Sequence, residues 1–219
     1  MTLDEYGAWA MDVDVARYGR MPEGVALLEL GLGFASEIGE IAGVLTKWLR
    51  DGKPLRDQLI DELGDAAYYW ARLSVVAGII PSALLARSRA HVDWRRAGRA
   101  PGGPAPAVSG ISLDDFTVWV LAVQGAASLD PSSDQSLWTV GLALVGDTGE
   151  VVECIRRLGR DVGQHERLAG ELGDVWRYWT RLCAAVDIIP AEVLTRSRTK
   201  IEERLTKREA SSPLPDPRD

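Results

Sequence analysis

Eight acidic residues, arranged in four motifs with the same internal spacing, are the side chains of this chain best suited to chemistry. The motifs are Glu37-x-x-Glu40, Glu62-x-x-Asp65, Asp147-x-x-Glu150 and Glu171-x-x-Asp174. Residues three apart lie on one face of a helix, so each motif presents two carboxylates together. Carboxylate oxygens are preferred ligands of Mg²⁺, which also binds the phosphate oxygens of substrates. The motifs therefore predict metal sites that act on a phosphate-bearing molecule.

The apolar residues around each motif indicate that the acids point towards the protein core. They recur three and four residues from the acids, as Phe34, Ile41, Val44 and Trp48, then Leu59, Ala66, Tyr69 and Leu73. The later motifs have Leu144, Val151, Cys154 and Leu158, then Leu168, Val175, Tyr178 and Leu182. Gathering four carboxylates in a partly dry cleft costs on the order of several kcal/mol for each unpaired ion. We therefore expect Mg²⁺, with Mn²⁺ as an alternative ion, to be bound by the acids of both pairs of motifs.

The four motifs belong to two copies of one sequence unit. Trp9 matches Trp119 at an offset of 110 residues, and the first motif matches the third at the same offset. The second motif matches the fourth at an offset of 109 residues, as do the later segments Ile79-Ile80-Pro81 and Ile188-Ile189-Pro190. Because order and spacing are both preserved, we interpret the chain as a tandem duplication.

The repeat also predicts the domain boundaries. Two helical units are expected at residues 1–97 and 111–210. Residues 98–110, GRAPGGPAPAVSG, are rich in Gly, Pro and Ala, a composition typical of linkers. Residues 211–219 have a similar composition and are expected to form a flexible tail.

Within each unit the apolar residues recur at three and four, which predicts an all-α fold with four helices per unit. Thr2 and Glu5 have the form of a capping box at the start of the first helix. The other helices of the first unit are expected at 24–50, at 55–77 and from Pro81 onwards. Their counterparts in the second unit are expected at 134–158, 165–186 and 190–208.

Charge and composition argue against several classes of protein. The chain has 25 Lys and Arg against 32 Asp and Glu, a net charge of -7, so it repels nucleic acids and anionic membranes. Its two cysteines, Cys154 and Cys183, have neither a disulfide-scaffold nor a zinc-ribbon pattern. No signal peptide or membrane-spanning apolar run is apparent in the sequence. We expect a cytoplasmic protein that binds neither nucleic acid nor membrane.

Two other interpretations of the acids can be compared with the same residues. A ferritin-like di-iron site needs a Glu-x-x-His pair, but Ser88 and Val162 stand three residues before His91 and His165. That interpretation fails. Salt bridges to Lys or Arg would also neutralise the acids and leave a purely structural bundle, so this alternative remains open.

The segments GFASEIGEIAGVLTKW and DELGDAAYYWARLSVVAGI resemble the MazG-like, all-α nucleoside triphosphate pyrophosphatase superfamily, whose hallmark is ExxE on one helix and ExxD on the next. The resemblance covers nearly the whole chain, twice. It implies paired four-helix units, here joined covalently as a pseudo-dimer, and it leaves a further homodimer open. It also implies Mg²⁺-dependent hydrolysis of a nucleoside triphosphate, often a non-standard one, to the monophosphate and pyrophosphate.

Carried over by position, the resemblance implies that Glu37, Glu40, Glu62 and Asp65 bind the metal, as do Asp147, Glu150, Glu171 and Asp174. It further implies that Glu37 or Glu40 takes the proton of the attacking water. Where family members have Asn and, three residues on, Lys, this chain has Ser88 and His91 in the first copy and Ser197 and Lys200 in the second. Only Lys200 is therefore retained as a phosphate contact. Asp147 is one methylene shorter than Glu37, which predicts a second site that is either weaker or serves a different role.

Further substrate contacts are predicted from charge and aromatic character. Lys47, Arg72 and Arg157 are candidates for contacting phosphate, and Trp48 and Tyr69 for stacking on the base. Trp70 is a third aromatic candidate, although core packing is the more common role for each of these aromatic residues.

Two other hypotheses of function remain. The chain is a non-catalytic module that binds a nucleotide or a protein partner and keeps relic metal sites, or only one copy is active and the other is a scaffold.

Overall fold

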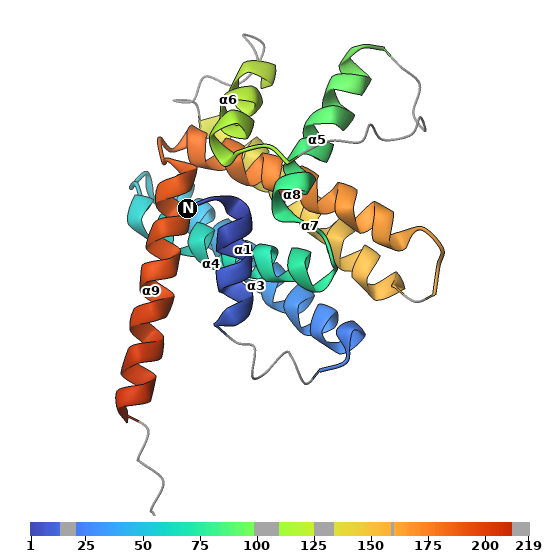
Figure 1. Cartoon of the computed structure of the whole chain (residues 1–219). Coiled ribbons are helices and arrows are strands. Elements are labelled where there is room, and N and C mark those ends of the chain that lie inside the picture. The colour runs from blue at the N-terminus through green and yellow to red at the C-terminus, as the bar shows by residue number, and fades with distance from the viewer. Residues whose placement is uncertain (14–20, 99–109, 125–133, 159, 212–219) are drawn as a thin grey trace, which may run out of the picture.

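The computed structural model describes residues 1–13, 21–98, 110–124, 134–158 and 160–211 (Figure 1). Its helices are α1 (Leu3–Asp12), α3 (Glu23–Asp51), α4 (Arg56–Val76), α5 (Pro81–Arg96), α6 (Leu113–Gln124), α7 (Asp134–Arg157), α8 (Gln164–Ala185) and α9 (Pro190–Ser211). No strand occurs in these ranges. The predicted all-α class is confirmed, and the predicted helix boundaries lie within a few residues of the observed ones.

The first helix begins as its sequence predicts. The Glu5 amide donates to Thr2 Oγ1 at 3.1 Å, and the Thr2 amide donates to Glu5 Oε2 at 2.7 Å, which completes a capping box. At the corresponding start of α6, the Asp115 amide donates to Ser112 Oγ at 3.0 Å. There the Ser112 hydroxyl donates to the Asp115 carboxylate, so the return bond to the backbone is replaced by a side-chain contact.

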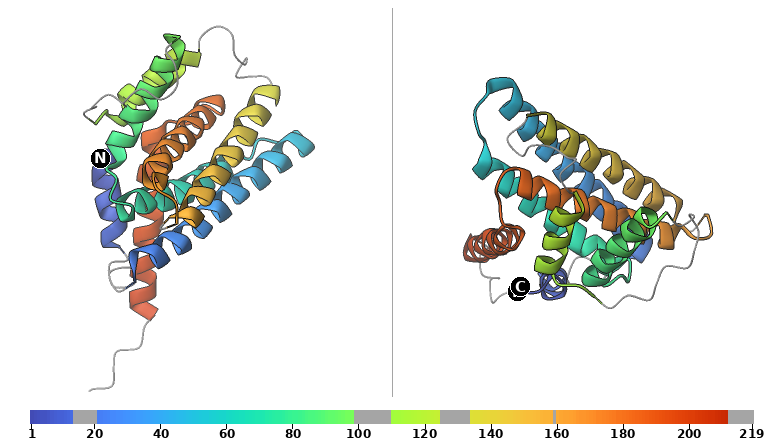
Figure 2. Two further views of the ribbon diagram at one scale, coloured as in Figure 1. Left: turned by 90° about the vertical axis from the view of Figure 1, so that its right-hand side faces the viewer. Right: turned by 90° about the horizontal axis from the view of Figure 1, so that it is seen from above.

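Helices α3 and α7 pack side by side, as both views in Figure 2 show. Each has a glycine at the contact: a Cβ on Gly31 would lie 2.8 Å from Ile155 Cδ1, and a Cβ on Gly141 would lie 2.7 Å from Leu45 Cδ1. Gly31 and Gly141 are matching positions of the repeat, as are Leu45 and Ile155. The same pair of contacts is therefore made twice, with the roles of the two helices reversed.

The last helix of each copy packs against the other copy. Helix α5 lies on α8, and α9 lies on α4. The ion pair between Arg87 Nη1 and Glu166 Oε1, at 2.6 Å, joins the first of these contacts. The pair between Arg196 Nη1 and Asp57 Oδ1, at 3.3 Å, occupies the matching place in the second. The two copies thus exchange their last helices, and the sequence did not indicate this exchange.

A cluster of tryptophans lies where the copies meet. The rings of Trp70 and Trp176 have centroids 4.1 Å apart, and those of Trp176 and Trp179 lie 4.3 Å apart. Trp70 Nε1 donates to the Leu172 carbonyl at 2.9 Å, and Trp179 Nε1 donates to the Leu63 carbonyl at 3.1 Å. All three tryptophans are fully buried, so the two copies share one core.

Two sequence expectations fall largely outside the described residues, namely most of the linker at 98–110 and of the tail at 211–219. No single helix in the described ranges is long and apolar enough to cross a membrane. Helices α4 and α5 pass such a test, by length and composition only, when they are joined across a bend of 95°.

Candidate metal centre

Three of the predicted acids meet between α3 and α4. Glu37 comes from α3, Glu62 and Asp65 come from α4, and one carboxylate oxygen of each lies within 4.8 Å of the others. All three side chains are partly buried. A compact set of hard oxygen donors suits Mg²⁺ or Mn²⁺. Glu40 lies one turn further along α3 and is exposed, outside this set of three.

Packing of α3 on α4 fixes these acids in place. Ile38 and Ile41 on α3, and Leu63 on α4, are at most 2% exposed, so both helices have a fixed rotation about their axes. Gly33 allows Tyr69 to approach α3 closely, because a Cβ at position 33 would lie 2.2 Å from Tyr69 Cε1. Position 33 is one turn before Glu37 and position 69 one turn after Asp65, so the Tyr69 ring borders the acids.

Burial, followed by the charges of neighbouring carboxylates, raises the pKa values of Glu37 and Glu62. Burial is the main cause that brings the pKa of Glu37 from 4.5 to about 7, and the charges of Asp65, Glu62 and Glu40 add to it. The pKa of Glu62 is also raised, first by burial and then by Asp65. Lys200 opposes both increases. The cluster therefore favours a bound cation, be it a proton or a metal ion.

Lys200 reaches this cluster from α9, the last helix of the second copy. Its Nζ donates to Asp65 Oδ2 at 2.6 Å, and the two side chains are only 22% and 19% exposed. One turn earlier, Ser197 Oγ donates to the Gly64 carbonyl at 2.9 Å and lies 2.9 Å from Tyr6 Oη. Lys200 belongs to the second copy by sequence, but the packing of α9 on α4 places it at the first-copy acids.

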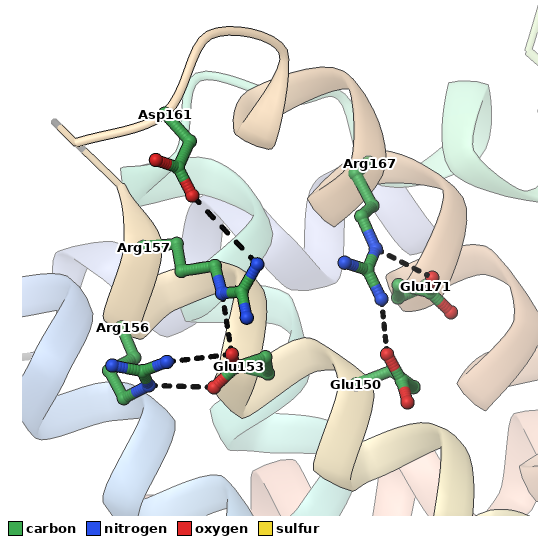
Figure 3. Close-up of polar contacts among 7 residues, drawn as sticks. All are labelled: Glu150, Glu153, Arg156, Arg157, Asp161, Arg167 and Glu171. Atoms are coloured by element: carbon green, nitrogen blue, oxygen red, sulfur yellow. Dashed lines mark hydrogen bonds and ion pairs between the residues drawn. The ribbon is translucent and has the colours of Figure 1, made fainter.

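Three acids of the second copy, Glu150, Glu171 and Asp174, form ion pairs with arginines. Arg167 lies between Glu150 and Glu171, forming an ion pair with each (Figure 3); its Nε is 3.5 Å from Glu171 Oε1. Arg177 Nε is 3.6 Å from Asp174 Oδ1. Within the described part of the chain, these acids do not form a set of three with ligand oxygens within 4.8 Å of one another.

Asp147 and Asp174 are the two aspartates of the second-copy acids. Burial, followed by the charge of Asp174, raises the pKa of Asp147 from 3.8 to about 6, while Arg177 opposes the increase. Ser88 Oγ, from α5 of the first copy, donates to Asp174 Oδ1 at 3.3 Å. His91, the counterpart of Lys200, is exposed. Neutralisation by salt bridges, the alternative to metal binding, therefore applies to Glu150, Glu171 and Asp174.

The remaining predicted contacts lie away from the first-copy acids. Lys47 is exposed and ten residues beyond Glu37, about 15 Å along a helix. Trp48 packs against the core, and Arg72 is only 3% exposed, with its Nη1 donating to Tyr68 Oη at 3.2 Å. Arg157 forms ion pairs with Glu153 and Asp161 (Figure 3). Of the predicted substrate contacts, Tyr69 and Lys200 are those that the structure brings to the centre.

The sequence interpretation overlooked Arg167 and Arg177. Both could have been found from helix spacing, because Arg167 is four residues before Glu171 and Arg177 three residues after Asp174.

The chain has a partial likeness to a known protein. No family model matches the chain, and no solved structure matches it. A stretch of 101 residues, 45% of this chain, is 33% identical to the phosphatidylglycerol–prolipoprotein diacylglyceryl transferase of Nitrobacter hamburgensis. The match covers 26% of that protein, so the chain spans about a quarter of its curated relative. This likeness does not show a family.

Proposed function

We propose that the protein is a MazG-like enzyme that hydrolyses a nucleoside triphosphate to the monophosphate and pyrophosphate. The observation that carries the proposal is the convergence of Glu37, Glu62 and Asp65, with Lys200 from a third helix at the same place. The three carboxylates fit a divalent ion, Mg²⁺ or Mn²⁺, in their chemistry and spacing. When bound there, the ion would neutralise the phosphate charge that increases as the phosphorus–oxygen bond breaks.

The protein side chains have separate parts in the proposed reaction. Glu40, exposed beside the three ligands, takes the proton of a water molecule as the water oxygen bonds to the nucleotide phosphorus. The bond from that phosphorus to the pyrophosphate oxygen breaks, and pyrophosphate leaves with the bonding electron pair. Lys200 exchanges its contact with Asp65 for a phosphate oxygen of the substrate. Tyr69 borders the acids and offers a ring face to the nucleotide.

The exchange of helices supports the further proposal that the two copies form an intramolecular pseudo-dimer. Contacts related by the repeat occur in reciprocal pairs, as in an isologous dimer interface. The bonds from Trp70 to Leu172 and from Trp179 to Leu63 are one such pair. In this arrangement the second copy supplies Lys200 to the centre of the first.

The test is pyrophosphate release from a panel of standard and modified ribo- and deoxyribonucleoside triphosphates with Mg²⁺. We expect release from at least one member and a loss of about 100-fold or more in Glu62→Gln, because one ligand of the centre is removed. Asp51→Asn is the matched control, since this exposed carboxylate lies at the end of α3 and pairs with Arg50. Absence of release from every member, or full activity in Glu62→Gln, would contradict the proposal and favour a binding module.

A further inference from the structure

The two copies neutralise their acids in different ways. Within the described part of the chain, the first copy has four carboxylates and one cation in contact with them, Lys200. The second has four carboxylates and two guanidinium groups, which carry the same formal charge as one divalent ion. The positions of Arg167 and Arg177 are occupied in the first copy by Gln58 and Tyr68, which carry no charge.

Arg167 bridges the same pair of helices that a metal ion would bridge. Glu150 belongs to α7 and Glu171 to α8, the counterparts of α3 and α4. In Figure 3 the Arg167 guanidinium lies between these two carboxylates, with an ion pair to each. In the first copy, the corresponding helices bring together Glu37, Glu62 and Asp65 themselves.

Arg177 adds a second, less exposed contact. Its side chain is 17% exposed and that of Asp174 is 22% exposed. Its guanidinium also lies 4.3 Å from the centre of the Tyr178 ring, a cation–π contact. A metal ion that took Asp174 as a ligand would leave a largely buried cation without its counter-ion, which is costly.

We infer that Arg167 and Arg177 take the place of a metal ion in the second copy by neutralising its acids, so that this copy has a structural role. The chain therefore binds one divalent ion, at the acids of the first copy. The inference rests on the metal-binding part of the proposed function and is independent of whether a nucleotide is hydrolysed. The sequence predicted a metal site in each copy. The inference instead gives the first copy a metal site and the second copy two arginines that carry the same charge as the metal ion.

The experiment is a titration of the metal-free protein with Mn²⁺, followed by calorimetry and by the electron paramagnetic resonance of free Mn²⁺. We expect about one ion per chain, an affinity at least tenfold lower in Glu62→Gln, and little change in Glu171→Gln. The double variant Arg167→Gln, Arg177→Tyr installs the first-copy residues in the second copy. We expect it to bind about two ions per chain.

Two ions of similar affinity in the unaltered protein would overturn the inference, as would a folded double variant that still binds one ion. Circular dichroism establishes that the double variant is folded; if it is not, Arg167→Gln alone is titrated, with the same two outcomes. Failure of the inference is distinct from failure of the proposed function. A protein that binds one Mn²⁺ but releases no pyrophosphate from any triphosphate would refute the function and leave the inference standing.

Discussion

Glu37→Gln is expected to stabilise the metal-free protein while removing its metal site. The substitution keeps the shape of the side chain and removes one of several crowded negative charges. The pKa of Glu37 rises from 4.5 to about 7, and each pKa unit corresponds to about 1.4 kcal/mol. Water reaches part of the side chain and screens the repulsion, which reduces the gain to about 1–2 kcal/mol. For a chain of this size, that corresponds to about 2–4 °C in Tm for each kcal/mol.

The gain should depend on pH in a defined direction. Because the folded-state pKa of Glu37 lies above its unfolded value, its contribution to stability is complete below about pH 4.5 and is lost as the pH rises through about 7. Gln has no such titration. The difference in unfolding free energy between the variant and the unaltered protein should therefore be close to zero at about pH 4 and maximal at about pH 8.

Urea unfolding of both proteins at these two pH values, with chelator present, measures the difference. Asp147→Asn is the matched control, because burial raises the pKa of Asp147 from 3.8 to about 6. We expect this control also to gain stability at about pH 8 but to keep its Mn²⁺ affinity, whereas Glu37→Gln loses affinity. If Glu37→Gln were no more stable than the unaltered protein at about pH 8, or bound Mn²⁺ equally well, the description of this site would be wrong.

Three further outcomes are expected. Lys200→Met should lower kcat/KM for the nucleoside triphosphate by about tenfold or more, through loss of a charged phosphate contact, and equal kinetics would argue against this contact. Mn²⁺ affinity should rise as the pH rises from about 6 to about 8, because the ion displaces a proton from Glu37; calorimetry in buffers of different ionisation enthalpy counts that proton. Gly33→Ala should destabilise the protein by about 1–3 kcal/mol, since the new Cβ would overlap the Tyr69 ring. Gly43→Ala should instead stabilise it by about 0.5–1 kcal/mol, because open space surrounds that position. Thermal unfolding of the two variants measures both effects.

Local sequence patterns were sufficient to predict the helices and the three meeting acids. Periodicity and caps are short-range signals, so the N-cap of α1 at Thr2 and the start of α5 at Pro81 could be located directly. The inward direction of Glu37, Glu62 and Asp65 followed from apolar neighbours at three and four residues. Glu40 lies at the edge of the same stripe and is exposed. An apolar stripe indicates the face on which a side chain lies, but it does not indicate how deeply that side chain is buried.

The exchange of α5 and α9 could not be predicted in this way. Two copies of one unit have the same apolar faces, so periodicity gives no preference for packing within a copy over packing between copies. The placement of Lys200 beside Asp65 depends on that choice. The same holds for the ion pair of Arg167 with Glu150, which joins two helices, whereas its pair with Glu171 could have been read from the sequence.

The most direct test of the metal centre is anomalous scattering from crystals of the metal-free protein soaked in Mn²⁺. The structure predicts an anomalous peak between the carboxylates of Glu37, Glu62 and Asp65 and none between α7 and α8. A peak among Asp147, Glu171 and Asp174, or the absence of any peak at the first-copy acids, would contradict the account.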